Sequence, residues 1–135
     1  MIYVVIDTNV LVSALLAKND DVATVQILKK MIMGEIIPVY SREIIFEYKD
    51  VLNRKKFNFS KQLVNYFIDF IEKFGIFSDP KKLNIDFVDI KDLPFYEVVM
   101  NKEDKEHYLV TGNIKHFPKE PFIVTPRELI DILNS

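Results

Sequence analysis

Polar side chains that could bind a metal ion follow apolar runs at two distant points of this chain. Asp7 directly follows the β-branched run Ile2–Ile6, and Asn113 follows residues 108–111 through a glycine. Each pattern predicts a buried parallel strand with the polar residue just beyond its carboxyl end. In open α/β sheets, ligands bind outside that end of the strands. A carboxylate there either binds a metal ion or caps the next helix, and for Asp7 both interpretations stay open.

Two further acids belong to predicted helices or their starts. On a helical wheel Glu47 lies beside an apolar stripe, which makes it the acid of its helix nearest the interior. The stripe consists of Ile44, Tyr48, Val51 and Leu52. A carboxylate at its edge is costly unless it is paired or bound to metal, and the alternative is a solvated flank with contacts to Asp50 or Arg54. Asp92 precedes the next predicted helix, which it could instead cap.

Three of these oxygen-bearing side chains, Asp7, Asp92 and Asn113, fall at strand ends or helix starts of one predicted sheet, and Glu47 lies at the inner edge of a neighbouring helix. Hard oxygen ligands without histidine or cysteine suit Mg²⁺ or Mn²⁺. Clustered carboxylates repel one another, so we expect a cation to hold them together. For Asn113 the alternative is a turn residue in the left-handed conformation. Glu97 is expected to lie in solvent or just behind the site.

The elements that must position these residues alternate between strand and helix. Apolar runs predict strands at residues 2–6, 36–40, 76–77, 107–111 and 122–125. Helical periodicity and capping residues predict helices at 9–17, 22–33, 43–53, 61–74, 92–100 and 126–133. The alternation predicts a three-layer α/β/α domain over residues 1–135, with a central, mostly parallel sheet of four to five strands. Pro38 favours an edge or terminal position for the second strand.

The composition and net charge of the chain exclude several classes of protein. The chain has 135 residues, of which 49% are hydrophobic, and that excludes a mainly disordered segment. No apolar run reaches the roughly 20 residues of a membrane helix, and no secretory signal is present, so we expect a soluble cytoplasmic protein. The net charge of −2 argues against a general nucleic-acid coat protein. It leaves room for a local basic patch, or for ordinary solvated side chains, at Lys49, Arg54, Lys55, Lys56, Lys115 and His116.

Four segments carry a resemblance that spans nearly the whole chain. They are Val5–Val10 (VIDTNV), Glu43–Leu52, Asp89–Phe95 and Tyr108–Asn113 with the following Lys115–Pro118. In this order they resemble the PIN-domain family of Mg²⁺- or Mn²⁺-dependent ribonucleases. The resemblance is to the VapC-like toxin component of type II toxin–antitoxin systems.

The resemblance implies an acidic metal site made by Asp7, Glu47 and Asp92, with Thr8 and Thr111 as supporting hydroxyl donors. Asn113 stands where many members carry a fourth acid. The implied reaction is metal-assisted hydrolysis of RNA phosphodiester bonds. The implied partners are the RNA substrate and a cognate antitoxin protein that blocks the cleft. Apolar residues of segments 22–33 and 61–74 are expected to form a homodimer or antitoxin surface.

Two other function classes remain open from the residues. Asn113 is compatible with a catalytically degenerate module that binds RNA or protein. A phosphatase or phospho-acceptor domain with Asp7 as nucleophile is disfavoured, because Asn9 stands where the haloacid dehalogenase pattern needs a second aspartate. His107 is expected to be structural rather than a general base.

Overall fold

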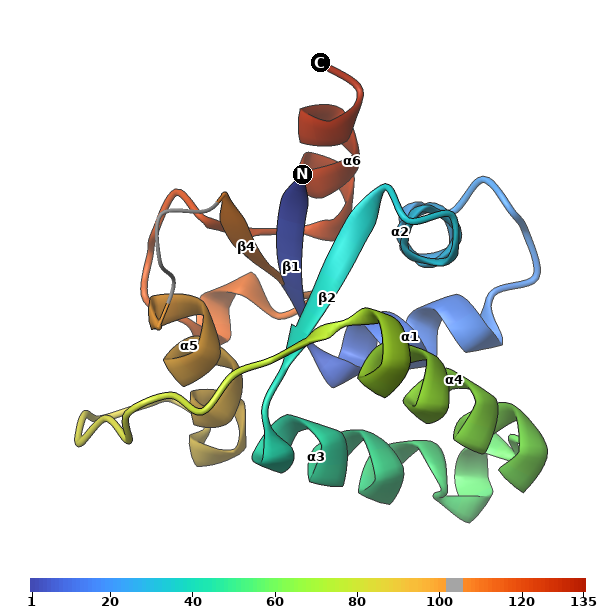
Figure 1. Ribbon diagram of the computed structural model, residues 1–135, viewed down its shortest axis with the longest axis horizontal. Helices are drawn as coiled ribbons and strands as arrows, with labels where there is room; N and C mark the ends of the chain where they lie inside the picture. Colours follow the sequence, from blue (N-terminus) through green and yellow to red (C-terminus); the bar gives the residue numbers. More distant parts are fainter. Residues whose placement is uncertain (102–105) are drawn as a thin grey trace.

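The computed structural model describes residues 1–101 and 106–135, and these form a five-stranded parallel sheet in the order β3-β2-β1-β4-β5 (Figure 1). The strands are β1 Ile2–Ile6, β2 Ile36–Tyr40, β3 Ile76–Phe77, β4 His107–Val110 and β5 Ile123–Val124. In the register of the two central strands, Ile6 lies opposite Val110. The residues that follow, Asp7 and Thr111, therefore emerge side by side at the carboxyl edge of the sheet.

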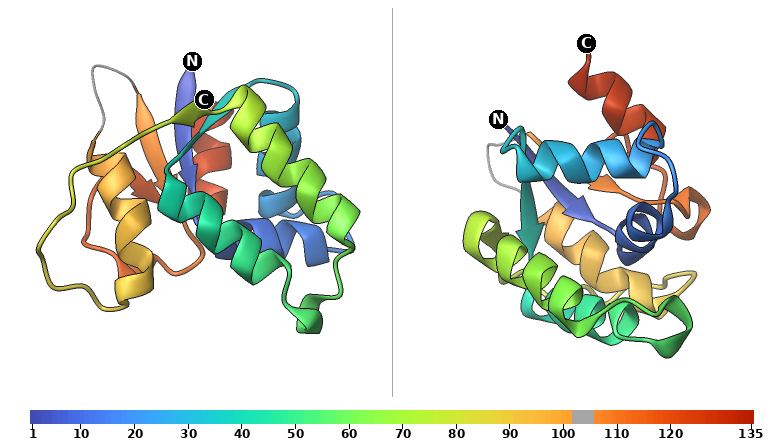
Figure 2. Two further views of the ribbon diagram at one scale, coloured as in Figure 1. Left: turned by 60° about the horizontal axis from the view of Figure 1, so that its bottom comes forward. Right: turned by 90° about the vertical axis from the view of Figure 1, so that its right-hand side faces the viewer.

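Helices cover both faces of this sheet. They are α1 Thr8–Leu16, α2 Ala23–Ile32, α3 Arg42–Leu52, α4 Lys61–Phe74, α5 Leu93–Met100 and α6 Pro126–Leu133. On one face α2 contacts α1 and α6, and on the other α3 contacts α4 and α5 (Figure 2). This confirms the predicted three-layer α/β/α architecture and its parallel sheet. In residues 1–101 and 106–135 we find no helix with the length and apolar content needed to span a membrane.

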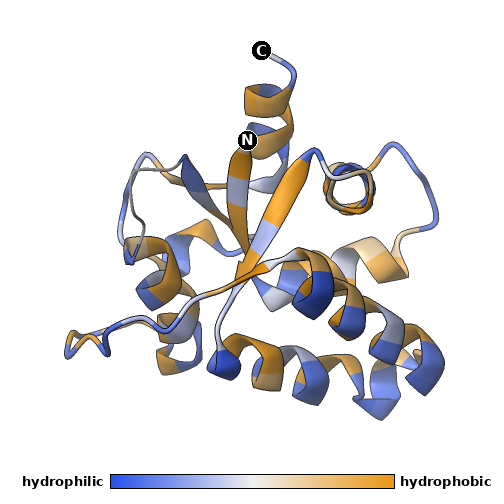
Figure 3. Cartoon of the chain, in the orientation of Figure 1, coloured by the Kyte–Doolittle hydropathy of each residue, from blue (hydrophilic) through white to orange (hydrophobic). Residues whose placement is uncertain are grey.

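The core lies on both faces of β1, whose residues Val4 and Val5 are fully buried. The strands carry mainly apolar residues, and helices α2, α3, α4 and α6 are amphipathic (Figure 3). The apolar face of α4 supplies Phe67, Ile68 and Ile71 to this core. Much of the apolar content of α4 that suggested a partner surface therefore packs inside the domain.

Short polar residues begin the helices that carry or support the site. Ser41 accepts a hydrogen bond from the backbone N–H of Ile44, and Ser60 accepts one from Leu63. Thr125 and Glu128 form a reciprocal capping box at the start of α6. Such side chains satisfy backbone donors that a helix leaves free at its first turn, which is why the predicted starts at 61 and 126 are confirmed.

The prediction for Pro38 was wrong, and so was one of the two alternatives for Glu97. Strand β2 lies between β3 and β1, so Pro38 is not at an edge. The proline is tolerated because, within the described residues, β3 pairs with β2 only from Val39 onward. Glu97 is not in solvent but 4% exposed, and its carboxylate accepts a hydrogen bond from the Leu83 N–H at 2.6 Å. It fastens the long segment before α5 to the domain.

Candidate metal centre

Asp7 lies just beyond β1, and its side chain is only 3% exposed. Its Oδ2 accepts hydrogen bonds from Thr111 Oγ1 at 2.7 Å and from Asn9 Nδ2 at 3.2 Å. Within the described residues, the Asp7 side chain makes no capping hydrogen bond, although α1 begins at the next residue. The capping interpretation of Asp7 is therefore wrong, and the carboxylate is held by side chains from two segments that are distant in sequence.

The surroundings of Asp7 disfavour its charged form. Burial raises the pKa of its carboxyl from 3.8 to about 6. The hydrogen bond from Thr111 opposes this rise, whereas the charges of Asp92 and Glu47 add to it. A buried carboxylate near two other acids is stabilised when a cation shares the site. Perturbed acids of this kind are typical of functional sites.

Glu47 reaches the same region from α3. It is half-buried, whereas Glu43 and Asp50 on the same helix are exposed, as the helical wheel predicts. Its Oε2 accepts a hydrogen bond from Thr8 Oγ1 at 3.3 Å. Arg54 instead pairs with Asp50 at 3.3 Å, so the predicted alternative of a Glu47–Arg54 contact is not the observed pairing.

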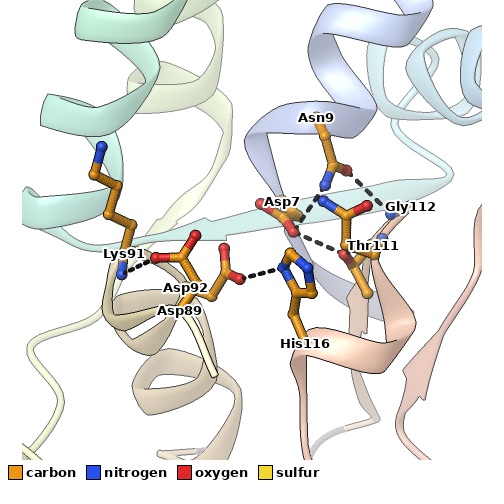
Figure 4. A network of polar contacts seen from close by, with 9 residues as sticks. Asp7, Asn9, Asp89, Lys91, Asp92, Thr111, Gly112 and His116 are labelled. Carbon is orange, nitrogen blue, oxygen red and sulfur yellow. Dashed lines mark hydrogen bonds and ion pairs between the residues drawn. The ribbon is translucent and has the colours of Figure 1, made fainter. Parts of the chain in front are cut away.

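Asp92 precedes α5 and contacts a residue from the segment that follows β4. Its Oδ2 lies 3.1 Å from His116 Nδ1 (Figure 4). Burial raises the pKa of the Asp92 carboxyl, the hydrogen bond with His116 lowers it, and the nearby charge of Asp89 raises it. In the part of the chain that the structure describes, the Asp92 side chain makes no capping hydrogen bond, so it is free for another role.

The turn after β4 connects the two halves of the site. Gly112 N–H donates to Asn9 Oδ1 at 3.0 Å, and Asn113 N–H donates to Thr111 Oγ1 at 2.9 Å. The amide of Asn9 thus joins this turn to Asp7 (Figure 4). Asn113 has a φ of −117°, so the left-handed interpretation was wrong. Sequence reasoning missed Asn9, although its position two residues after a strand-terminal aspartate was a usable signal.

All four predicted site residues line one cleft of about 370 Å³. They are Asp7, Glu47, Asp92 and Asn113, and Asn9, Asp89, Lys91, Arg54 and Phe57 are among the other lining residues. Of the predicted phosphate-binding residues, Arg54 lines this cleft. Lys49, Lys55, Lys56 and Lys115 are exposed elsewhere on the surface. The acids thus gather at the carboxyl edge of the sheet, with two cationic side chains beside them.

The donor set of the cleft fits a divalent cation. Carboxylate and amide oxygens predominate, and these are the ligands that Mg²⁺ and Mn²⁺ accept. Among the described residues, one group is compact enough for its ligand atoms to lie within 4.8 Å of one another, namely Asp89, Asp92 and His116. Asp7 and Glu47 line the same cleft but are not part of this compact group. Water ligands commonly fill such gaps around Mg²⁺, which keeps part of its hydration shell.

Comparison with known proteins identifies the family of this chain. The profile of the PIN domain matches residues 3–115, which include every residue of the candidate site except His116. Searches of curated proteins and of solved structures gave no match. The chain therefore belongs to the PIN-domain family, whose members are generally nucleases. The family and the acidic cleft together support a nuclease-type function.

Proposed function

We propose that this protein is a divalent-metal-dependent endoribonuclease that hydrolyses RNA phosphodiester bonds, with Mg²⁺ or Mn²⁺ as cofactor. The observation that carries the proposal is the convergence of Asp7, Glu47 and Asp92 from three different elements on one cleft. Asp7 and Glu47 each hold a hydrogen bond from a threonine hydroxyl, which restricts the orientation of the carboxylates. Restricted ligands lose less freedom when a cation binds.

In this proposal Asp7 and Asp92 bind the cation directly, and Glu47 completes the site directly or through water. When bound, the cation lowers the pKa of a ligated water and offsets negative charge on the phosphate and the leaving oxygen. Thr111 and Asn9 keep Asp7 oriented toward the cleft through their hydrogen bonds. Asn113 offers an amide oxygen at the cleft wall and can orient a water molecule without adding charge.

Arg54 and Lys91 are the side chains proposed to hold the RNA backbone beside these acids. Both line the cleft, so a phosphate near the carboxylates lies within reach of a positive charge. Contacts of this type position a strand without reading its sequence. Lys49 lies on α3, and Lys55 and Lys56 lie just beyond this helix. All three are exposed outside the cleft, and we propose that they contact more distant phosphates of the RNA.

The test is cleavage of a labelled RNA mixture by purified protein in Mn²⁺, in Mg²⁺ and in EDTA. We expect metal-dependent cleavage by the wild type and a loss of at least about 100-fold in Asp7→Asn. Asp131→Asn on the exposed face of α6 is the matched control and should cleave like the wild type. Cleavage that persists in EDTA or in Asp7→Asn would contradict the proposed site.

Asn113 favours a second candidate function, a degenerate PIN-like module that binds RNA or protein without cutting it. The two candidates differ in metal binding. A functional site gains stability from Mn²⁺, by about 2.7 kcal/mol when the free metal is 100 times its dissociation constant. A degenerate site should show little change in Tm with Mn²⁺ and no cleavage, whatever the RNA.

We also propose that the protein is the toxin of a toxin–antitoxin pair and acts in the cytoplasm, where its RNA substrate is. The support for this proposal is that four segments of the chain resemble, in the same order, those of PIN-domain toxins. The cognate antitoxin is proposed to cover the acidic cleft, and a homodimer is proposed at the apolar surface around Ile32, Met33 and Phe74. These three side chains are 46–71% exposed and border a groove of about 320 Å³. If the protein has the mass of a monomer in solution, both alone and after mixing with the antitoxin, the assignment of this surface as an interface would be contradicted.

A further inference from the structure

His116 contacts Asp92 next to the cleft, and the oxygen-based metal site leaves it unexplained. It ends the short 3-10 helix Ile114–His116 that follows the turn after β4. Its backbone N–H donates to the carbonyl of Asn113 at 2.9 Å, and the next residue, Phe117, is 7% exposed. Phe117 packs edge-on against Phe87, with the ring centroids 5.6 Å apart. The backbone that carries the imidazole therefore has fixed contacts on both sides of His116.

In this position the imidazole ring of His116 contacts the carboxylate of Asp92. Nδ1 lies 3.1 Å from Asp92 Oδ2. One possible ligand atom from each of His116, Asp92 and Asp89 lies within 4.8 Å of the other two. Neighbouring ligands of an octahedral ion are about 3 Å apart, and opposite ligands are about 4.2 Å apart. The 3.1 Å between His116 Nδ1 and Asp92 Oδ2 is thus the spacing of neighbouring ligands of one ion, and a carboxylate oxygen of Asp89 is close enough to approach the same ion.

We infer that His116 is a nitrogen ligand of the cation bound at Asp92, and that this nitrogen makes the site favour Mn²⁺ over Mg²⁺. The inference rests on the proposed metal site and deepens it by specifying the metal. Nδ1 can bind a metal when the ring proton is on Nε2, so the same atom that meets Asp92 can supply a lone pair. Imidazole suits transition-metal ions, whereas Mg²⁺ prefers oxygen and water.

The opposing explanation is that His116 only donates a hydrogen bond to Asp92. In that case the ring orients the carboxylate and never touches the metal, and the cation meets oxygen alone. Both explanations predict that loss of His116 weakens the site. They differ in whether nitrogen is directly bonded to the ion, which a spectroscopic measurement can resolve.

Pulsed electron paramagnetic resonance of Mn²⁺ bound to the full chain, without a histidine tag, makes this test. The chain has two histidines, so ¹⁴N coupling from an imidazole arises from His116 or His107. We expect the coupling in the wild type and its loss in His116→Asn, which places an oxygen near the position of Nδ1. His107→Phe is the matched control, because it keeps a ring to stack on Tyr3, whose centroid is 5.2 Å away.

Titration calorimetry with each metal alone gives a second readout. We expect His116→Asn to weaken Mn²⁺ binding about 10- to 100-fold and Mg²⁺ binding much less. Absence of imidazole coupling in the wild type, or coupling that persists in His116→Asn, would overturn the inference. An equal loss of affinity for Mn²⁺ and Mg²⁺ in His116→Asn would also overturn the inference.

Activity measured on the same samples separates this inference from the proposed function. Cleavage by a protein whose Mn²⁺ shows no imidazole coupling would leave the ribonuclease proposal standing and remove the role of His116. Imidazole-bound Mn²⁺ without cleavage of any RNA would support the role of His116 and count against the ribonuclease. Failure of the wild type to bind Mn²⁺ would overturn both.

Discussion

Replacing Asp7 by asparagine should stabilise the metal-free protein at neutral pH while it destroys metal binding. Burial raises the pKa of this carboxyl from 3.8 to about 6. At about 1.4 kcal/mol per pH unit, the ionised carboxylate therefore costs the folded state about 3 kcal/mol. The substituted asparagine would carry no charge, and its amide oxygen could keep one of the two hydrogen bonds that Asp7 accepts. Subtracting about 1 kcal/mol for the other bond leaves a net gain of about 2 kcal/mol.

The gain should depend on pH with a definite sign. Between the ordinary value of 3.8 and the folded value of about 6, the folded state binds more protons at Asp7 than the unfolded chain does. The contribution of Asp7 to the stability of the wild type therefore falls as the pH rises from 3.8 to about 6. The advantage of Asp7→Asn should shrink by about 2 kcal/mol when the pH is lowered from 7 to 4.

Urea unfolding in EDTA at several pH values between 4 and 7.5 measures this difference directly. Thermal unfolding in EDTA at pH 7.5 gives a second readout: the Tm of the variant should be about 7 °C higher, from about 3–4 °C per kcal/mol for a chain of this size. Asp131→Asn is exposed and should change stability by no more than about 0.5 kcal/mol at any pH. An Asp7→Asn variant that is no more stable at pH 7.5, or whose advantage does not vary with pH, would refute the desolvation argument.

Three structural predictions can be checked by urea unfolding alone or with one further assay. Tyr48→Phe removes the buried hydroxyl that donates to the carbonyl of Ile6, and it should cost about 1–2 kcal/mol; no loss would mean that water replaces the hydroxyl. Glu97→Leu removes the acceptor of the Leu83 N–H, so stability should fall by about 1–3 kcal/mol and limited proteolysis should cut residues 79–91 faster. Gly75→Ala places a Cβ 2.5 and 2.6 Å from two backbone carbonyl oxygens, and it should cost at least about 1 kcal/mol; an unchanged midpoint would contradict this packing.

The order of strands and helices was readable from the sequence because it depends on local chemistry. The β-branched run Ile2–Ile6 and the serine and threonine caps act within a few residues of themselves. The same local logic located Asp7 at a strand end and Glu47 at the edge of an apolar stripe. What the sequence determined by itself was therefore the architecture and the candidate acids.

The contacts among those residues depended on how distant segments pack. The pairing of β1 with β4 brings Thr111 to Asp7 across 104 positions of sequence, and the turn after β4 carries His116 to Asp92. Glu97 is buried because segment 79–91 lies over it, which no periodicity within α5 expresses. Strand order likewise placed Pro38 inside the sheet. Only the tertiary structure decided these points, because desolvation and side-chain partners belong to the assembled surfaces and not to any local pattern.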